Sequence, residues 1–132
     1  MHSLTFTRLR SVESLTDIDI ALTKASRQFK TSPPSPKRTC IEIVSDVLLQ
    51  HHAVTTRKWL SGLIQDLKSK GFTTLAVIDP SMHPSEEANA ILGLFDGEIR
   101  INERETAEGR IKTLKILRLL NQNYLKNELA MG

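Results

Sequence analysis

Two hydrophobic periods alternate along the chain, and the changes between them mark out its elements. Between Ser14 and Phe29 apolar side chains return every three or four residues, which predicts an amphipathic helix capped by Ser14. The segment 38–49, RTCIEIVSDVLL, is almost continuously apolar as far as Val44 and predicts a strand covered on both faces. Three prolines at 31–37 predict a surface connection between this helix and this strand.

The middle of the chain repeats the alternation of strand and helix. A polar turn is expected at 50–54, followed by a second helix that Thr55 caps and Gly71 ends. The segment 72–78, FTTLAVI, predicts a second apolar strand. A third helix is expected to open at Ser85, because two glutamates follow it in the first turn.

The C-terminal third favours antiparallel strands. One strand is expected near 98–102 and a second at 111–120, with residues 103–110 linking them as a hairpin. Residues 124–129 are expected to form a last short strand or a turn of helix. At the other end of the chain, 5–9 is expected to form a short strand.

These segments together predict an α/β fold with a mainly parallel central sheet, helices on both faces and an antiparallel C-terminal hairpin. Two apolar strands joined by a helix form a right-handed βαβ unit, so their carboxyl ends meet at one edge of the sheet. Open α/β sheets bind ligands at that edge. A length of 132 residues suits one core, so 1–132 is interpreted as a single domain.

Candidate ligand-binding residues gather where the two predicted strands end. Glu42 lies inside the first apolar run, Ser45 and Asp46 close it, and Asp79 closes the second run. A carboxylate within a buried strand is costly unless it is paired, and one use for it is to hold a metal-bound water beside a nucleotide. The alternative for Glu42 is an ion pair with a nearby lysine or arginine, which we favour for this chain alone.

Neither nucleophilic catalysis by Ser45 nor metal binding by the histidines is favoured by the sequence. Ser45 as a nucleophile would need His51 or His52 as its base and lacks a glycine elbow, so we expect Ser45 and Asp46 to satisfy backbone donors at the strand end. His51, His52 and His83 suggest a metal site, but adjacent histidines on an extended segment point opposite ways and no HExxH spacing is present. We therefore assign no catalytic residue and no metal ligand.

Composition limits the classes of function. The chain is 39% hydrophobic and 25% charged, as in ordinary soluble proteins, and no apolar run nears the roughly 18 residues of a membrane span. We expect a cytoplasmic protein without membrane contact. The net charge of +3 is spread along the chain, so nucleic-acid binding is only weakly indicated. The single cysteine, Cys40, is expected to be a small core side chain.

The predicted hairpin contains six of the 18 lysines and arginines: Arg100, Arg104, Arg110, Lys112, Lys115 and Arg118. They could contact phosphate, a nucleic-acid backbone or an acidic partner, and Arg118 is the candidate retained for ligand binding. Strand alternation puts Lys112 and Arg118 on one face and Lys115 on the other. We therefore favour a solvated sheet edge, on which lysine guards against unwanted strand pairing.

In order and spacing, these segments resemble the C-terminal half of the ATPase core in KaiC-like proteins of the RecA superfamily, of the archaeal type. The segment 38–49 resembles the Walker B stretch of that family, with Glu42 as its acid. KSKGFTTLAVID and FDGEIRI are similar to its next units, and RIKTLKILRLL resembles the strand that carries a Lys-x-Arg-Gly ending.

The resemblance implies a partial RecA-like core from which the GxxxxGK[ST] phosphate loop is absent. The family acid is usually Asp where this chain has Glu42, Arg118 stands in the place of the Lys, and Leu120 and Asn121 replace Arg-Gly. It implies a noncatalytic regulatory or oligomerising module, either a homo-oligomer or bound to a partner protein over its sheet edge. The alternative is half of a genuine ATPase, which would use ATP and magnesium if a P-loop half completed it.

Overall fold

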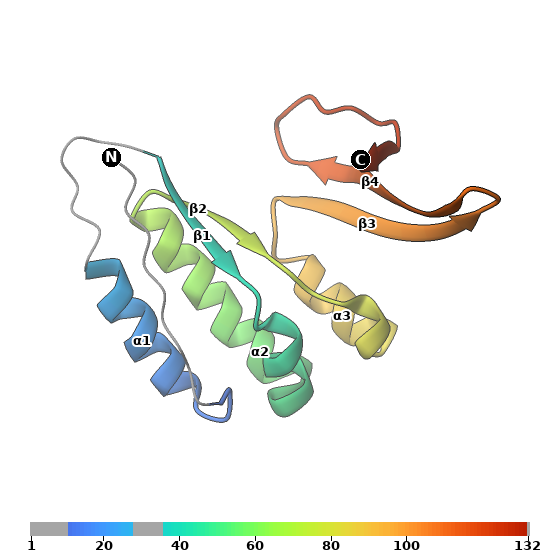
Figure 1. Ribbon diagram of the computed structural model, residues 1–132. Helices are drawn as coiled ribbons and strands as arrows, with labels where there is room; N and C mark the ends of the chain where they lie inside the picture. The colour runs from blue at the N-terminus through green and yellow to red at the C-terminus, as the bar shows by residue number, and fades with distance from the viewer. Residues whose placement is uncertain (1–10, 28–35, 132) are drawn as a thin grey trace. The chain divides into compact units, whose positions relative to one another are not determined.

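The computed structural model describes residues 11–27 and 36–131, which contain the helices and strands shown in Figure 1. The described chain is mixed α/β, with a two-stranded parallel sheet and a three-stranded antiparallel sheet. It forms two compact units, residues 1–91 and 92–132. The predicted strand at 5–9 and most of the proline-rich connection at 31–37 lie outside the described residues.

The first helix, α1, spans Leu15–Arg27. The Ser14 hydroxyl accepts a hydrogen bond from the Asp17 backbone N–H at 3.2 Å, which confirms the predicted N-cap. Ile18 lies on the inner side of this helix and is only 1% exposed. The apolar stripe read from the sequence therefore points into the first unit.

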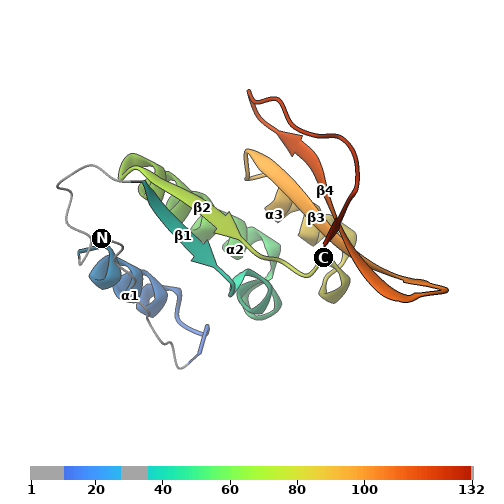
Figure 2. The same ribbon diagram turned by 45° about the horizontal axis from the view of Figure 1, so that its top comes forward.

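The first unit is built on a parallel β–α–β arrangement, as predicted. Strands β1 (Lys37–Ile41) and β2 (Phe72–Ala76) pair in parallel, and in both views they lie side by side (Figures 1 and 2). Helix α2 (Val44–Ser69) connects them and packs against β2. The buried apolar residues of this helix form most of the core: Val44, Val47, Leu48, Leu60, Leu63, Ile64 and Leu67.

The predicted strand at 38–49 is wrong in its second half. β1 ends at Ile41 and α2 begins at Val44, so Ser45 and Asp46 lie in the first turn of a helix. The apolar residues beyond the turn are spaced for burial on a helix, with Val44, Val47 and Leu48 each at most 1% exposed. A short apolar run fits either period, and here packing selected the helix.

The predicted turn at 50–54 shrinks to one residue. His52 alone leaves helical geometry, with φ 64° and ψ 175°, and kinks α2. The buried Thr56 hydroxyl donates to the Val47 carbonyl at 3.4 Å across this kink. Thr55 therefore lies inside α2, and the residue before the helix, Ile43, provides no side-chain cap. Gly71, with φ 83°, follows the C-cap residue Lys70, as the predicted helix end requires.

After β2 the chain forms a short 3-10 helix, η1 (Pro80–Met82), and then α3 (Ser85–Leu92). The start of α3 at Ser85 agrees with the prediction. Ala88 and Ile91 are buried at 3% and 0% exposure and form the inner side of α3.

The second unit is an antiparallel sheet in the order β3 (Gly97–Thr106), β4 (Gly109–Leu119) and β5 (Leu129–Met131). The hairpin is confirmed, but the predicted link at 103–110 is mostly strand and the turn contains only residues 107–108. A bulge between Glu98 and Ile99 places Arg118 opposite Glu98. The lysine-bearing strand is the central one, so the prediction that its lysines lie at a sheet edge is wrong, although Lys112 and Lys115 are exposed to solvent as predicted.

Among the described residues, no helix is both long enough and apolar enough to cross a bilayer.

Candidate functional site

The carboxyl ends of β1 and β2 bring together two of the predicted site residues. Ser45 lies just beyond β1, in the first turn of α2, and Asp79 lies three residues beyond β2. The Asp79 backbone N–H donates to the Ser45 hydroxyl at 2.9 Å. This contact follows from the parallel pairing, because the ends of parallel strands meet at one edge. The expected role of Ser45, satisfying a backbone donor, is confirmed.

A histidine completes this cluster. His83 Nε2 lies 2.9 Å from the Ser45 hydroxyl oxygen, and Ser45 is 9% exposed. The Ser45 oxygen accepts a hydrogen bond from the Asp79 N–H, which leaves the hydroxyl proton of Ser45 for another partner. Ser45 can donate this proton to Nε2 of a neutral His83 ring, whereas a protonated ring would donate to the Ser45 oxygen. The hydroxyl therefore links the start of α2 to the loop after β2.

The Asp79 carboxylate turns away from Ser45 and organises its own loop. Its Oδ1 accepts hydrogen bonds from the Ser81 hydroxyl at 2.6 Å and the Ser81 N–H at 3.0 Å, which caps η1. The Ser81 hydroxyl, then the Ser81 N–H and the nearby His83 hold the pKa of Asp79 below its ordinary value, although burial acts in the opposite direction. The carboxylate is therefore ionised at neutral pH.

Glu42 and Asp46 do not join this cluster. Glu42 lies in the turn after β1 and is exposed, so the prediction of a carboxylate inside a buried strand is wrong. Asp46 is also exposed, in the first turn of α2. Within the described parts of the chain neither carboxylate has a hydrogen bond or an ion pair, and the expected lysine or arginine partner of Glu42 is not found there. Both acids are open to solvent, so the expectation that Asp46 satisfies a backbone donor is wrong.

Arg118 has a structural role in the second unit. Its two terminal guanidinium nitrogens donate to the carbonyls of Leu92 and Phe95, each at 2.7 Å. Leu92 is the last residue of α3, so the guanidinium satisfies carbonyls that have no partner within the helix. This arginine is exposed but is already engaged with its own chain.

His51 and His52 contact neither Ser45 nor a metal-binding group among the described residues. His51 Nε2 lies 2.7 Å from the Val12 carbonyl, and His52 forms the kink, 4.0 Å from a Glu87 carboxylate oxygen. Neither is the base next to Ser45; that neighbour is His83. Over residues 11–27 and 36–131, no three His, Cys, Asp or Glu side chains form a group that could hold a metal ion.

Cys40 is exposed in β1, so its predicted place in the core is wrong. Strand alternation explains this outcome. Ile41 is buried against the helix side of the sheet, and its neighbour in the strand must point to the opposite face.

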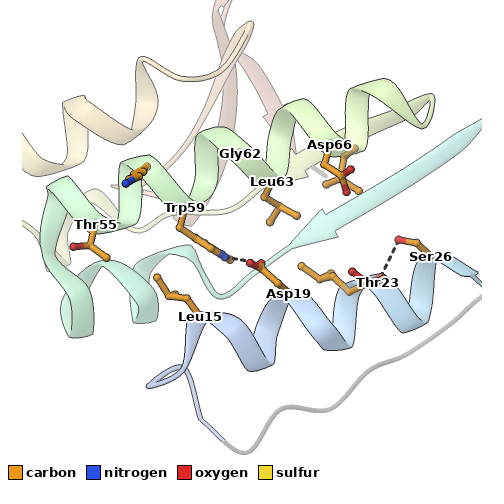
Figure 3. A pocket seen from close by; sticks show the side chains of 12 residues that line it. Leu15, Asp19, Thr23, Ser26, Thr55, Trp59, Gly62, Leu63 and Asp66 are labelled. Carbon is orange, nitrogen blue, oxygen red and sulfur yellow. Dashed lines mark hydrogen bonds between the residues drawn. The ribbon is translucent and has the colours of Figure 1, made fainter.

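A groove of about 560 Å³ between α1 and α2 was not indicated by the sequence (Figure 3). Leucines of both helices line it, and Gly62 leaves open space along the α2 side. The Trp59 indole N–H donates to Asp19 Oδ1 at 2.9 Å and ties the two helices together. The groove contains no cluster of catalytic groups and contributes only an apolar cleft.

The polar cluster at the strand ends can hold a loop but has no means of cradling phosphate. The Ser45 hydroxyl and the Asp79 backbone N–H are hydrogen-bonded to each other, and the whole sequence lacks a glycine-rich phosphate loop. No curated protein matches the chain by sequence. The family of unknown function DUF7504 matches residues 3–101, about three quarters of the chain. The chain therefore belongs to the DUF7504 family.

Proposed function

We propose that this chain is a noncatalytic or partial KaiC-like module of the RecA superfamily, which regulates or oligomerises and has no ATPase activity of its own. It acts by assembling with another protein unit over its parallel sheet. The order of segments that resembles the KaiC-like core supports the family part of the proposal. The exposed face of the β1–β2 pair supports the proposal that the chain assembles with another protein unit.

That face exposes apolar side chains on both strands. Leu75 is 57% exposed and lies opposite the exposed Cys40, and Val77, just beyond β2, is 48% exposed. Parallel sheets are almost always covered on both faces. Here α2 packs on β2, and no described element covers the outer side of these residues. A partner layer over this face would remove that apolar surface from water.

The absence of independent ATPase activity is supported by what the polar residues already bind. Ser45 is engaged with Asp79 and His83, and Arg118 with two carbonyls. Phosphoryl transfer needs donors directed at the phosphates, with a metal that the nucleotide helps to bind. Ser45 could supply such a donor only by breaking an existing contact, and Arg118 is held at the end of α3 by two of its five N–H donors.

Calorimetric titration of the purified chain with ATP and magnesium tests this function. We expect no binding at submillimolar nucleotide and no difference between the wild type and Glu42→Gln. Submillimolar affinity that is lost in Glu42→Gln would overturn the noncatalytic function. Asp66→Gln is a matched control, because Asp66 is an exposed acid whose carboxylate contacts Lys70, away from the strand ends.

A second candidate function rests on the two free acids. Glu42 and Asp46 are exposed near the carboxyl end of β1, where an ATPase of this superfamily holds its magnesium-bound water. The chain would then be half of an ATPase whose P-loop lies on another segment, with ATP and magnesium as cofactors. Hydrolysis measured after adding a P-loop half in trans, and abolished by Glu42→Gln, would favour this candidate over the first.

A further inference from the structure

Strand β3 is an open sheet edge among the described residues. In the unit 92–132 it pairs with β4 on one side only, over ten residues from Gly97 to Thr106. It contains neither proline nor lysine, and its five charged residues carry both signs, so pairing with another strand is opposed or favoured according to which charges meet. Ile99 and Ile101, at 52% and 58% exposure, lie on one of its faces.

We propose that β3 binds β3 of a second copy of this chain, antiparallel and centred on Ile101. The two three-stranded sheets then continue as one six-stranded sheet. This inference goes beyond the proposed function, since it concerns a different sheet and names the partner. The proposal rests on which charged residues oppose each other when β3 pairs with β3 of a second copy.

Two-fold symmetry restricts the registers that such a pair can adopt. An axis perpendicular to the sheet keeps each face continuous. It must therefore lie midway between one residue and its own copy, so that even positions pair with even and odd with odd. Centring on Arg100, Glu103 or Arg104 places two like charges directly opposite, and centring on Asn102 opposes Arg100 to Arg104. Like charges directly opposite on neighbouring strands are destabilising.

The register centred on Ile101 avoids every such clash. It opposes Ile101 to its own copy, Arg100 to Asn102, and Glu98 to Arg104 twice by symmetry. Centring on Ile99 also opposes unlike charges but uses only the first half of the strand. The Ile101 register is therefore the longest that charge allows.

The free chain has groups ready for these contacts. Arg104 is exposed and, in the part of the chain that the structure describes, has no ion pair or hydrogen bond. Among the described residues, Arg100 is the one ion-pair partner of Glu98, at 3.5 Å from Oε2, so the other carboxylate oxygen can accept an arginine from the second copy. Pairing also covers Ile101, whose side chain lies at the axis.

The isoleucines extend an apolar surface that pairing would make continuous. Ile101 faces Leu114 and Ile99 faces Ile116 across the hairpin, so all four lie on one face of the sheet. Joining two copies at β3 places the two sets of four side by side. In a single copy these side chains lie near the edge of a three-stranded sheet, and Ile99 and Ile101 stay about half exposed to water.

Sedimentation equilibrium of the full chain tests the proposal. We expect a reversible dimer, and Arg104→Glu should raise its dissociation constant roughly tenfold or more, because two attractive pairs become repulsive. Lys115→Glu is the control: it makes the same change of charge on the same face of the hairpin, but on the central strand β4. A monomeric wild type, or equal effects of the two variants, would overturn the proposal.

Cysteine cross-linking tests the register separately, in a Cys40→Ser background. At Ile101→Cys the two Cα atoms would lie about 4.5–5.5 Å apart, within the disulfide range of roughly 4.4–6.8 Å. At Glu103→Cys they would lie about 13 Å apart along the strands. Mild oxidation should cross-link the first variant and not the second, and the reverse result would exclude this register. ATP binding that depends on Glu42 would refute the proposed function and leave this dimer untouched.

Discussion

The parallel β1–α2–β2 unit and the antiparallel β3–β4–β5 sheet differ in what holds them together. Among the described residues, the first contains nine of the twelve buried apolar side chains, seven of them on α2 alone, and the other three lie on α1 and α3. In the second, Thr113 is the only buried residue among those described from Gly97 onward. Hydrophobic burial therefore stabilises the first unit, whereas backbone ladders stabilise the second.

Exposed ion pairs do not make up this difference. Arg110 contacts Glu103 at 3.9 Å and Glu105 at 3.4 Å, and Lys112 contacts Glu103 at 3.6 Å. All of these side chains are about half exposed or more, and such pairs contribute about 0–1 kcal/mol each. We infer that the antiparallel sheet is the less stable unit and the one that gains most from a partner.

The largest effect should come from emptying the core of the first unit. Leu60→Ala removes a side chain that is 0% exposed and should lower the free energy of unfolding by about 2–5 kcal/mol, measured by urea denaturation. Val54→Ala, at a position 85% exposed, is the control and should change it by less than about 0.5 kcal/mol. Equal losses would mean that α2 does not organise the core.

A smaller effect is expected at the strand ends. Ser45→Ala leaves the Asp79 N–H without its acceptor and should cost roughly 1–3 kcal/mol in urea denaturation. Ser69→Ala removes an exposed hydroxyl that bonds the Asp66 carbonyl within the same helix, and should cost clearly less. If the two serines prove equivalent, the cluster of Ser45, Asp79 and His83 does not secure the loop.

Two glycines sharpen the comparison between the units. A Cβ at Gly97 would lie 2.8 Å from Leu119 Cδ1 and 3.3 Å from the Arg118 carbonyl oxygen, so Gly97→Ala should strain the start of the hairpin by about 1 kcal/mol. Hydrogen exchange in β3 and β4 should then become faster. Gly62→Ala meets open space in α2 and should be stabilising by about 0.5–1 kcal/mol. The two substitutions should therefore change the free energy of unfolding in opposite directions.

The smallest effect concerns pH. The pKa of Asp79 is lowered in the folded chain from an ordinary value of 3.8, chiefly by the Ser81 hydroxyl. Its stabilising contribution is therefore fully present above that value and is lost as pH falls through the folded pKa. The stability difference between wild type and Asp79→Asn should persist from neutral pH to about 5 and disappear under more acidic conditions, as followed by thermal melting. A difference that grows on acidification would contradict the assignment.

Local sequence signals predicted several boundaries correctly because each depends on its own neighbours. Ser14 caps α1, Gly71 follows α2 in a left-handed conformation, and α3 opens at Ser85. The same reasoning failed after Ile41, where a short apolar run suits a strand or a helix equally, and at 50–54, where a polar segment lies within α2 instead of forming a turn. The site was half predictable: parallel pairing brought Ser45 to Asp79, but the partner His83 depended on how the loop after β2 folds back.

By itself the sequence determined the alternation of strand and helix, the parallel pair, the hairpin and the absence of a phosphate loop. These depend on residue type and spacing along the chain. Tertiary structure alone decided that α2 starts at Val44, that Arg118 binds the end of α3, and that the strand bearing the lysines lies in the middle of its sheet. Each of these depends on which surfaces meet across distant segments, and burial free energy settles that choice only when the whole unit is packed.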